Sequence, residues 1–84
     1  MSLSEQQRQQ LEEARDHHSK PYMRERCAAI LKMAEGKSPH WVATSGLLRR
    51  RDPDTVYRWL NAYLEEGMAG LLAHQHGGPV RRRL

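Results

Sequence analysis

The stretch that most constrains this chain runs from Asp52 to Gly67, because it contains both the start and the stop signals of a single helix. Asp52 is a favourable N-cap, and Pro53 is favoured in the first turn that follows it. Gly67 is a residue at which helices commonly end. The sequence therefore predicts a helix over residues 53–66.

This predicted helix is amphipathic. With successive residues about 100° apart, its apolar side chains share one flank, and they are Val56, Trp59, Leu60 and Tyr63. The other flank carries groups that form hydrogen bonds, namely Asp54, Tyr57, Arg58 and Asn61. One side of the helix is expected to pack on a core while the other faces solvent.

The length of 84 residues allows one small domain with a single thin core. Fourteen Lys and Arg against ten Asp and Glu give a formal charge of +4, which favours a polyanionic partner. The single cysteine, Cys27, cannot form an internal disulfide, and no apolar run is long enough to span a membrane. We expect a cytoplasmic protein, associated with the bacterial nucleoid when bound to DNA, and no membrane partner.

Periodicity and capping residues predict further helices over residues 4–16, 21–35 and 38–46, with a short return segment over residues 68–73. Ser4 and Gln7 have the spacing of a capping box. The second helix has the clearest apolar stripe, formed by Met23, Cys27, Ile30, Leu31 and Ala34. The first helix has few apolar residues, so we expect it to be the least securely packed.

A short helix, a turn and a helix with a polar outer flank follow one another in helix-turn-helix order. In the turn, Leu47 and Leu48 are expected to fill the angle between the two helices, while Arg49, Arg50 and Arg51 stay in solvent. This turn is about three residues longer than the common one. We expect an all-α helix-turn-helix bundle of four to five helices over residues 1–73, followed by an extended basic arm over residues 74–84.

Three motifs are similar to segments of one known family: AEGKS at residues 34–38, TVYRWL at 55–60 and EEGMAGLL at 65–72. Together they resemble the N-terminal DNA-binding region of bacterial insertion-sequence transposases of the mariner-like superfamily and of related regulators. The resemblance covers roughly residues 3–80. It implies a homeodomain-like helix-turn-helix domain whose central helix reads the major groove. Many relatives continue with a Gly-Arg-Pro arm that enters the minor groove, where this chain instead has GGPVRRR.

Candidate DNA contacts follow from side-chain chemistry. Arg58 can pair with a guanine edge and Asn61 with an adenine edge, while Tyr57 can touch a thymine methyl or a sugar. Asp54 is either an acceptor for cytosine or a plain helix-start carboxylate, and Arg58 can alternatively pair with Asp54. Thr55 and the backbone amides near it suit a phosphate. Further phosphate or minor-groove contacts are predicted for Lys37, Ser38, His40, Arg49, Arg50, Arg51, Arg81, Arg82 and Arg83.

We find no pattern typical of catalysis or of a cofactor, and we expect double-stranded DNA binding without chemistry. The pairs His17 with His18 and His74 with His76 lack the spacing of a structural zinc site. The alternative function is a protein-interaction adaptor, in which Trp41, Tyr57 and the first helix contact a partner. Pairing as a homodimer and association with a separate catalytic protein both stay open.

Overall fold

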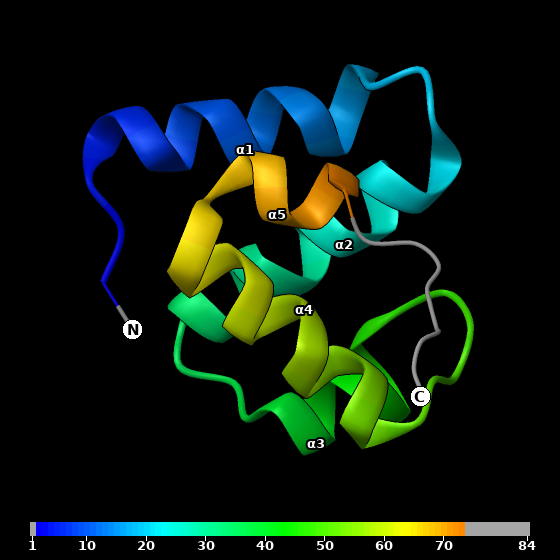
Figure 1. The fold of residues 1–84 in the computed structure, drawn as a ribbon. Coiled ribbons are helices and arrows are strands. Elements are labelled where there is room, and N and C mark those ends of the chain that lie inside the picture. The colour runs from blue at the N-terminus through cyan, green and yellow to red at the C-terminus, as the bar shows by residue number, and fades with distance from the viewer. Residues whose placement is uncertain (1, 74–84) are drawn as a thin grey trace, which may run out of the picture.

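The computed structural model describes residues 2–73. All regular secondary structure in this range is helical (Figure 1). The helices are α1 (Glu5–His17), α2 (Pro21–Ala34), α3 (Pro39–Trp41), the π-helical turn η1 (Val42–Gly46), α4 (Pro53–Glu66) and α5 (Met68–Ala73). The expected all-α helix-turn-helix fold is confirmed, whereas the predicted basic arm over 74–84 lies outside the described residues. Within residues 2–73, no helix is both long and apolar enough to cross a bilayer.

The helix ends follow the local signals in the sequence. Ser4 and Gln7 form the predicted capping box, with the Gln7 amide donating to the Ser4 hydroxyl oxygen at 3.1 Å. Gly36 and Gly67, which follow α2 and α4, have φ values of 107° and 67°. This left-handed conformation strains any residue with a Cβ, so glycine is suited to both helix ends.

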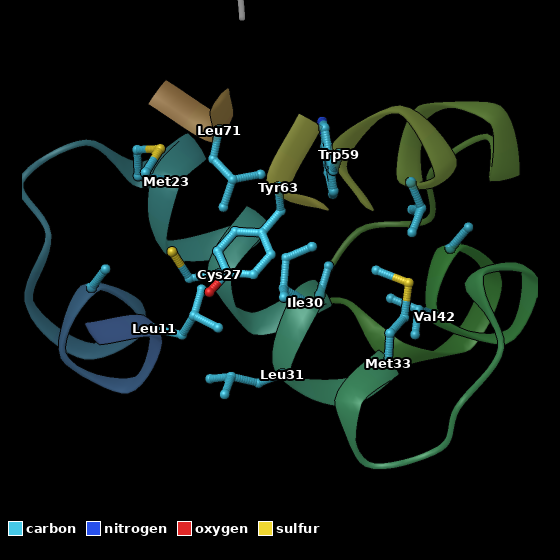
Figure 2. Packing of buried hydrophobic residues seen from close by; sticks show 14 residues of the cluster. Leu11, Met23, Cys27, Ile30, Leu31, Met33, Val42, Trp59, Tyr63 and Leu71 are labelled. Atoms are coloured by element: carbon cyan, nitrogen blue, oxygen red, sulfur yellow. The ribbon is translucent and has the colours of Figure 1, made fainter. Parts of the chain in front are cut away.

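The hydrophobic core lies around α2, which packs against α1, η1, α4 and α5. Figure 2 shows its predicted stripe, with Met23, Cys27, Ile30 and Leu31 pointing into the cluster. Ala34 is only half-buried, and the core continues instead along α2 through Ala29 and Met33. The other helices contribute Leu11, Ala14, Val42, Ala43, Val56, Trp59, Tyr63 and Leu71.

The expectation that α1 is the least securely packed helix is wrong. Leu11 is completely buried and Ala14 nearly so, and both lie in the same core as the α2 stripe. Figure 1 shows α1 passing along one side of the bundle, next to α2 and α5. Two buried positions one helical turn apart are enough to fix α1, because they meet α2, the described helix that contributes the most buried residues to the core.

The predicted short helix over 38–46 forms, but its second half is π-helical. The Thr44 hydroxyl donates to the His40 carbonyl at 2.9 Å, a side-chain bond that competes with the regular backbone ladder. A Cβ on Gly46 would stand 2.9 Å from the Trp41 ring, so this turn needs glycine where the indole lies over it. Val42 and Ala43 point into the core, as predicted.

Arg26 fastens α5 to the rest of the bundle. Its guanidinium lies 4.5 Å from the Tyr22 ring centre and 5.5 Å from that of Trp59. One of its nitrogens donates to the Leu71 carbonyl of α5 at 2.7 Å. The cation therefore joins α2, α4 and α5 by stacking on aromatic faces and capping a carbonyl, two interactions that favour arginine over lysine.

At Gly70 the backbones of α4 and α5 approach each other closely. A Cβ at this position would stand 2.3 Å from the Ala62 carbonyl oxygen and 2.9 Å from its carbon. Both atoms belong to the α4 backbone, which cannot move aside as a flexible side chain can. The absence of a side chain at Gly70 is thus what lets Leu71 of α5 reach the core.

We expect Gly70→Ala to destabilise the domain by about 1–3 kcal/mol, the usual cost of overpacking. In an open helix the same change would stabilise by about 0.5–1 kcal/mol, so the contact with α4 decides the sign. Urea unfolding followed by circular dichroism measures the change. Ala69→Ser, at the exposed neighbouring position, is the control and should shift the midpoint little. An increase in stability for Gly70→Ala would contradict the close approach.

Stability should fall as the pH rises from about 9 to about 11, because burial raises the pKa of Cys27 from 9.0 to about 11. In this window the unfolded chain has lost the thiol proton while the native state keeps it, so ionisation favours unfolding. Burial also raises the pKa of Tyr63, which acts in the same direction. Urea unfolding at pH 8, 9.5 and 10.5 tests this, with Cys27→Ala as the variant that should show the shallower dependence.

Candidate nucleic-acid interface

The polar flank of α4 faces solvent in full. Asp54, Tyr57, Arg58 and Asn61 are all exposed, and Tyr57 keeps 48% of its surface accessible. The apolar flank of the same helix is inserted in the core through Val56, Trp59 and Tyr63. The predicted division of the helix into a core flank and a solvent flank is confirmed, and four side chains able to form hydrogen bonds stand together on the outer surface.

Arg58 is available for an external partner. The two ion pairs within residues 2–73 join Arg15 to Asp16 at 2.9 Å and Arg51 to Glu25 at 2.7 Å. The alternative in which Arg58 pairs with Asp54 is therefore not seen. An exposed guanidinium that makes no ion pair within residues 2–73 retains its donors for a planar acceptor.

The amides at the start of α4 do not form the phosphate site that we expected. The Asp52 side chain accepts from the Asp54 amide at 2.8 Å, and the Asp52 carbonyl accepts from the Thr55 amide at 2.9 Å. Pro53 has no N–H, so the first donors of the helix are already absent or satisfied within the chain. The Asp52 carboxylate would also repel an anion. At this end of α4, the half-buried Thr55 hydroxyl remains as a candidate phosphate contact.

A second group of predicted contacts, Lys37, Ser38 and His40, is exposed at the start of α3. Ser38 is the N-cap of α3, and its hydroxyl oxygen accepts from the Trp41 amide at 3.0 Å. The Lys37 ammonium lies 5.0 Å from the centre of the Trp41 ring, which is 41% exposed. Because α3 packs beside α4 (Figure 1), these polar groups stand next to the helix that carries Arg58.

The loop from Leu47 to Asp52 departs from prediction at two residues. Leu48, expected to fill the angle between the helices, is completely exposed at 111%, while Leu47 alone packs against the core. Arg51, expected in solvent, donates two hydrogen bonds of 2.7 Å to the Glu25 carboxylate on α2. Arg49 and Arg50 do remain exposed.

Arg51 holds the end of this loop in two ways. Its amide donates to the Ala43 carbonyl of η1 at 2.8 Å, and its guanidinium pairs with Glu25 through both carboxylate oxygens. The hydrogen bonds to Glu25 raise the pKa of Arg51. Both groups are partly shielded from water, which makes a forked pair of this kind stronger than an open surface pair. Since Asp52 follows directly, Arg51 fixes where α4 begins.

We expect Glu25→Gln and Arg51→Gln to be coupled by about 1–2 kcal/mol, because the partial exposure of both groups lowers the roughly 1.5–3 kcal/mol typical of charge-assisted hydrogen bonds. Urea unfolding of the two single variants and the double variant gives the coupling as a double-mutant cycle. Arg50→Gln, at the exposed neighbour, should change stability by less than about 0.5 kcal/mol. Strictly additive effects of the two substitutions would show that the pair contributes nothing.

Other predicted features bear less on this surface. Within residues 2–73, no three His, Cys, Asp or Glu side chains gather in a way that could hold a metal ion. His18 has a structural role, since its Nδ1 accepts from the Lys20 amide at 3.0 Å after α1. Arg81, Arg82 and Arg83, together with His74 and His76, lie outside the described residues.

A profile of the family described as winged helix-turn helix matches residues 26–84. The chain belongs to this family. The winged helix-turn-helix match covers most of α2, the α3 and η1 segment, α4 and α5, and it leaves out α1. It identifies the exposed flank of α4 as part of a DNA-binding helix-turn-helix domain. No curated protein and no solved structure matches the chain.

Proposed function

We propose that this domain reads double-stranded DNA sequence-specifically, with α4 in the major groove and without catalysing a reaction. The single observation that carries the proposal is the exposed polar flank of α4, on which Arg58 makes no ion pair with any residue of the described segment 2–73. In a helix-turn-helix domain the second helix of the motif occupies the groove, and α4 has that position after α3 and η1. The buried flank of α4 fixes the helix so that the exposed side chains are presented in a constant geometry.

Base reading is assigned to the exposed flank. Arg58 suits the two acceptors of guanine, and Asn61 suits the acceptor and donor of adenine. They are three residues apart and thus neighbours on one helix surface. Tyr57 offers a ring for a thymine methyl or a sugar. Asp54 would accept from cytosine, although its place in the first turn is also favourable in a helix with no ligand.

Contacts with the DNA backbone are assigned to groups on both sides of α4. Lys37, Ser38 and His40 stand at the start of α3, where the first helix of the motif crosses the phosphates. Thr55, Arg49 and Arg50 lie at the entrance to α4. Arg51 is the member of the arginine run with a different role, because Glu25 already occupies its guanidinium. It would act by positioning the loop.

Arg58→Ala should flatten the preference between a selected duplex and a scrambled duplex, costing about 1–3 kcal/mol of discrimination. Fluorescence anisotropy on both duplexes, at fixed salt, measures this. The matched control is Arg8→Ala, which removes an exposed arginine from α1. Equal weakening on the two duplexes by Arg58→Ala would mean that Arg58 contacts phosphate and reads no base.

Salt dependence separates DNA binding from the adaptor alternative. Each phosphate contact contributes roughly 0.9 to the slope of log affinity against log salt. Substituting Arg81, Arg82 and Arg83 by glutamine should therefore weaken binding to all duplexes and reduce this slope. A protein that shows no affinity for any duplex at low ionic strength would instead support the adaptor, for which exposed Trp41 and Tyr57 would be the contact residues.

The biological setting proposed here is a transposase-like DNA-recognition module or a small transcriptional regulator. Three motifs support it: AEGKS before α3, TVYRWL on α4 and EEGMAGLL across α5. A DNA-binding domain of this size gains specificity most simply when two copies bind two half-sites. We therefore expect a DNA-bound homodimer. Association with a separate catalytic protein is the other form consistent with the proposal.

A further inference from the structure

A groove runs along the flank of α2 that faces away from the core. At about 100° per residue, Pro21, Ala28 and Lys32 lie opposite the stripe that contains Met23 and Ile30. The loop after η1 lies beside this flank, and together they enclose an open groove of about 870 Å³. α4 packs on the other side of α2, so the groove and the exposed flank of α4 belong to different faces of the domain, and Arg49 in the loop is the residue that both surfaces share.

The floor of the groove is apolar. Pro21 and Ala28 contribute from α2, while Leu47 and Leu48 contribute from the loop. Leu48 is the most exposed large hydrophobic residue in residues 2–73. A leucine held entirely in water contributes nothing to folding, whereas the same side chain buried against a partner would stabilise the complex.

The rim of the groove is basic. Its charged side chains are those of Arg15, Arg24, Lys32, Arg49, Arg51 and Glu25. Most of these cations already have a partner in the chain, since Arg15 pairs with Asp16, Arg51 pairs with Glu25, and Arg24 donates to the His18 carbonyl. Lys32 and Arg49 make no ion pair within residues 2–73, and they stand at the edge of the apolar floor.

We infer that this groove binds an acidic amphipathic segment of a partner protein. The apolar side chains of the segment would cover Leu47, Leu48 and Ala28, and its carboxylates would meet Lys32 and Arg49. Charge argues against the chain's own basic residues 81–83 as the occupant, in this molecule or in a second copy. A DNA backbone fits poorly too, because its sugars and phosphates would leave the apolar floor uncovered.

The probe that tests this is a fluorescein-labelled helical peptide of about 12 residues, with leucines spaced along one flank and glutamates on the other. A peptide of the same composition in permuted order, which has no apolar flank, is the matched ligand. The wild-type chain should bind the amphipathic peptide saturably and the permuted one about tenfold more weakly, by fluorescence anisotropy. Amide chemical-shift changes should centre on Ala28, Gly46 and Leu47.

Leu48→Ser should weaken peptide binding about tenfold, and Lys32→Glu should weaken it about fivefold. Leu48 is completely exposed and Lys32 is half-buried, and circular dichroism checks that both variants fold. Leu64→Ser is the matched control, since Leu64 is 63% exposed on α4, outside the groove. No saturable binding, or equal weakening by Leu64→Ser, would overturn the inference. So would displacement of the peptide by duplex DNA, or a change in self-association rather than peptide binding on Leu48→Ser.

The inference goes beyond the proposed function and does not require it. Leu48→Ser should leave duplex affinity unchanged within twofold in the anisotropy assay, while Arg58→Ala should leave peptide affinity unchanged. A chain that binds peptide but no duplex would refute the DNA proposal and keep the groove. A chain that binds duplex but no peptide would refute the groove proposal and keep the DNA proposal.

Discussion

Burial of one flank of α2 is the interaction on which the rest of this domain depends. Cys27 and Ile30, at the middle of that flank, are completely inaccessible to water, and α1, η1, α4 and α5 each cover part of it. None of those segments has enough apolar surface to form a core with a single other partner. The position of α4, and with it the direction in which Arg58 points, is therefore set by contacts made with α2.

The polar residues of α2 add to this control. Glu25 holds the loop that leads into α4, and its neighbour Arg26 holds α5, which follows α4. The two ends of the candidate recognition helix are thus fixed from adjacent positions on a single helix. Hydrophobic burial orients α4, whereas these hydrogen bonds determine where its first and last turns lie. In this way a small domain can hold its helices in fixed positions without a larger core.

Features that depend on neighbours in sequence were predictable. Caps, helix ends and the two flanks of α4 follow from spacing alone, so Ser4, Gly67 and Tyr57 are all found where the pattern indicated. The errors involve contacts between distant residues. Arg51 and Glu25 are 26 positions apart, and no local signal connects them. Leu48 was misplaced for the same reason, since apolar character alone does not say which of two adjacent leucines meets the core.

The candidate site contains both predicted and mispredicted features. Exposure of Asp54, Arg58 and Asn61 follows from helical periodicity, because the opposite flank of α4 has to be buried. The amides at the start of α4 were misjudged, since a good N-cap satisfies the donors that an anion would need. Asp52 is such a cap. Because it accepts hydrogen bonds from the first amides of α4, those amides are not free to bind a phosphate. Gly70 had no visible role in the sequence, because its importance comes from the Ala62 carbonyl beside it.

The anchoring of the loop by Arg51 has a consequence for how such a domain can diversify. Because its base is fastened to both η1 and α2, the tip at residues 48–50 can change in sequence or length without moving α4. The side chains that determine DNA sequence specificity would then lie in one part of the chain, and those that determine which partner protein is bound would lie in another. The two parts could be mutated separately. Evolution, or an engineer, could exchange one specificity while the other is inherited intact.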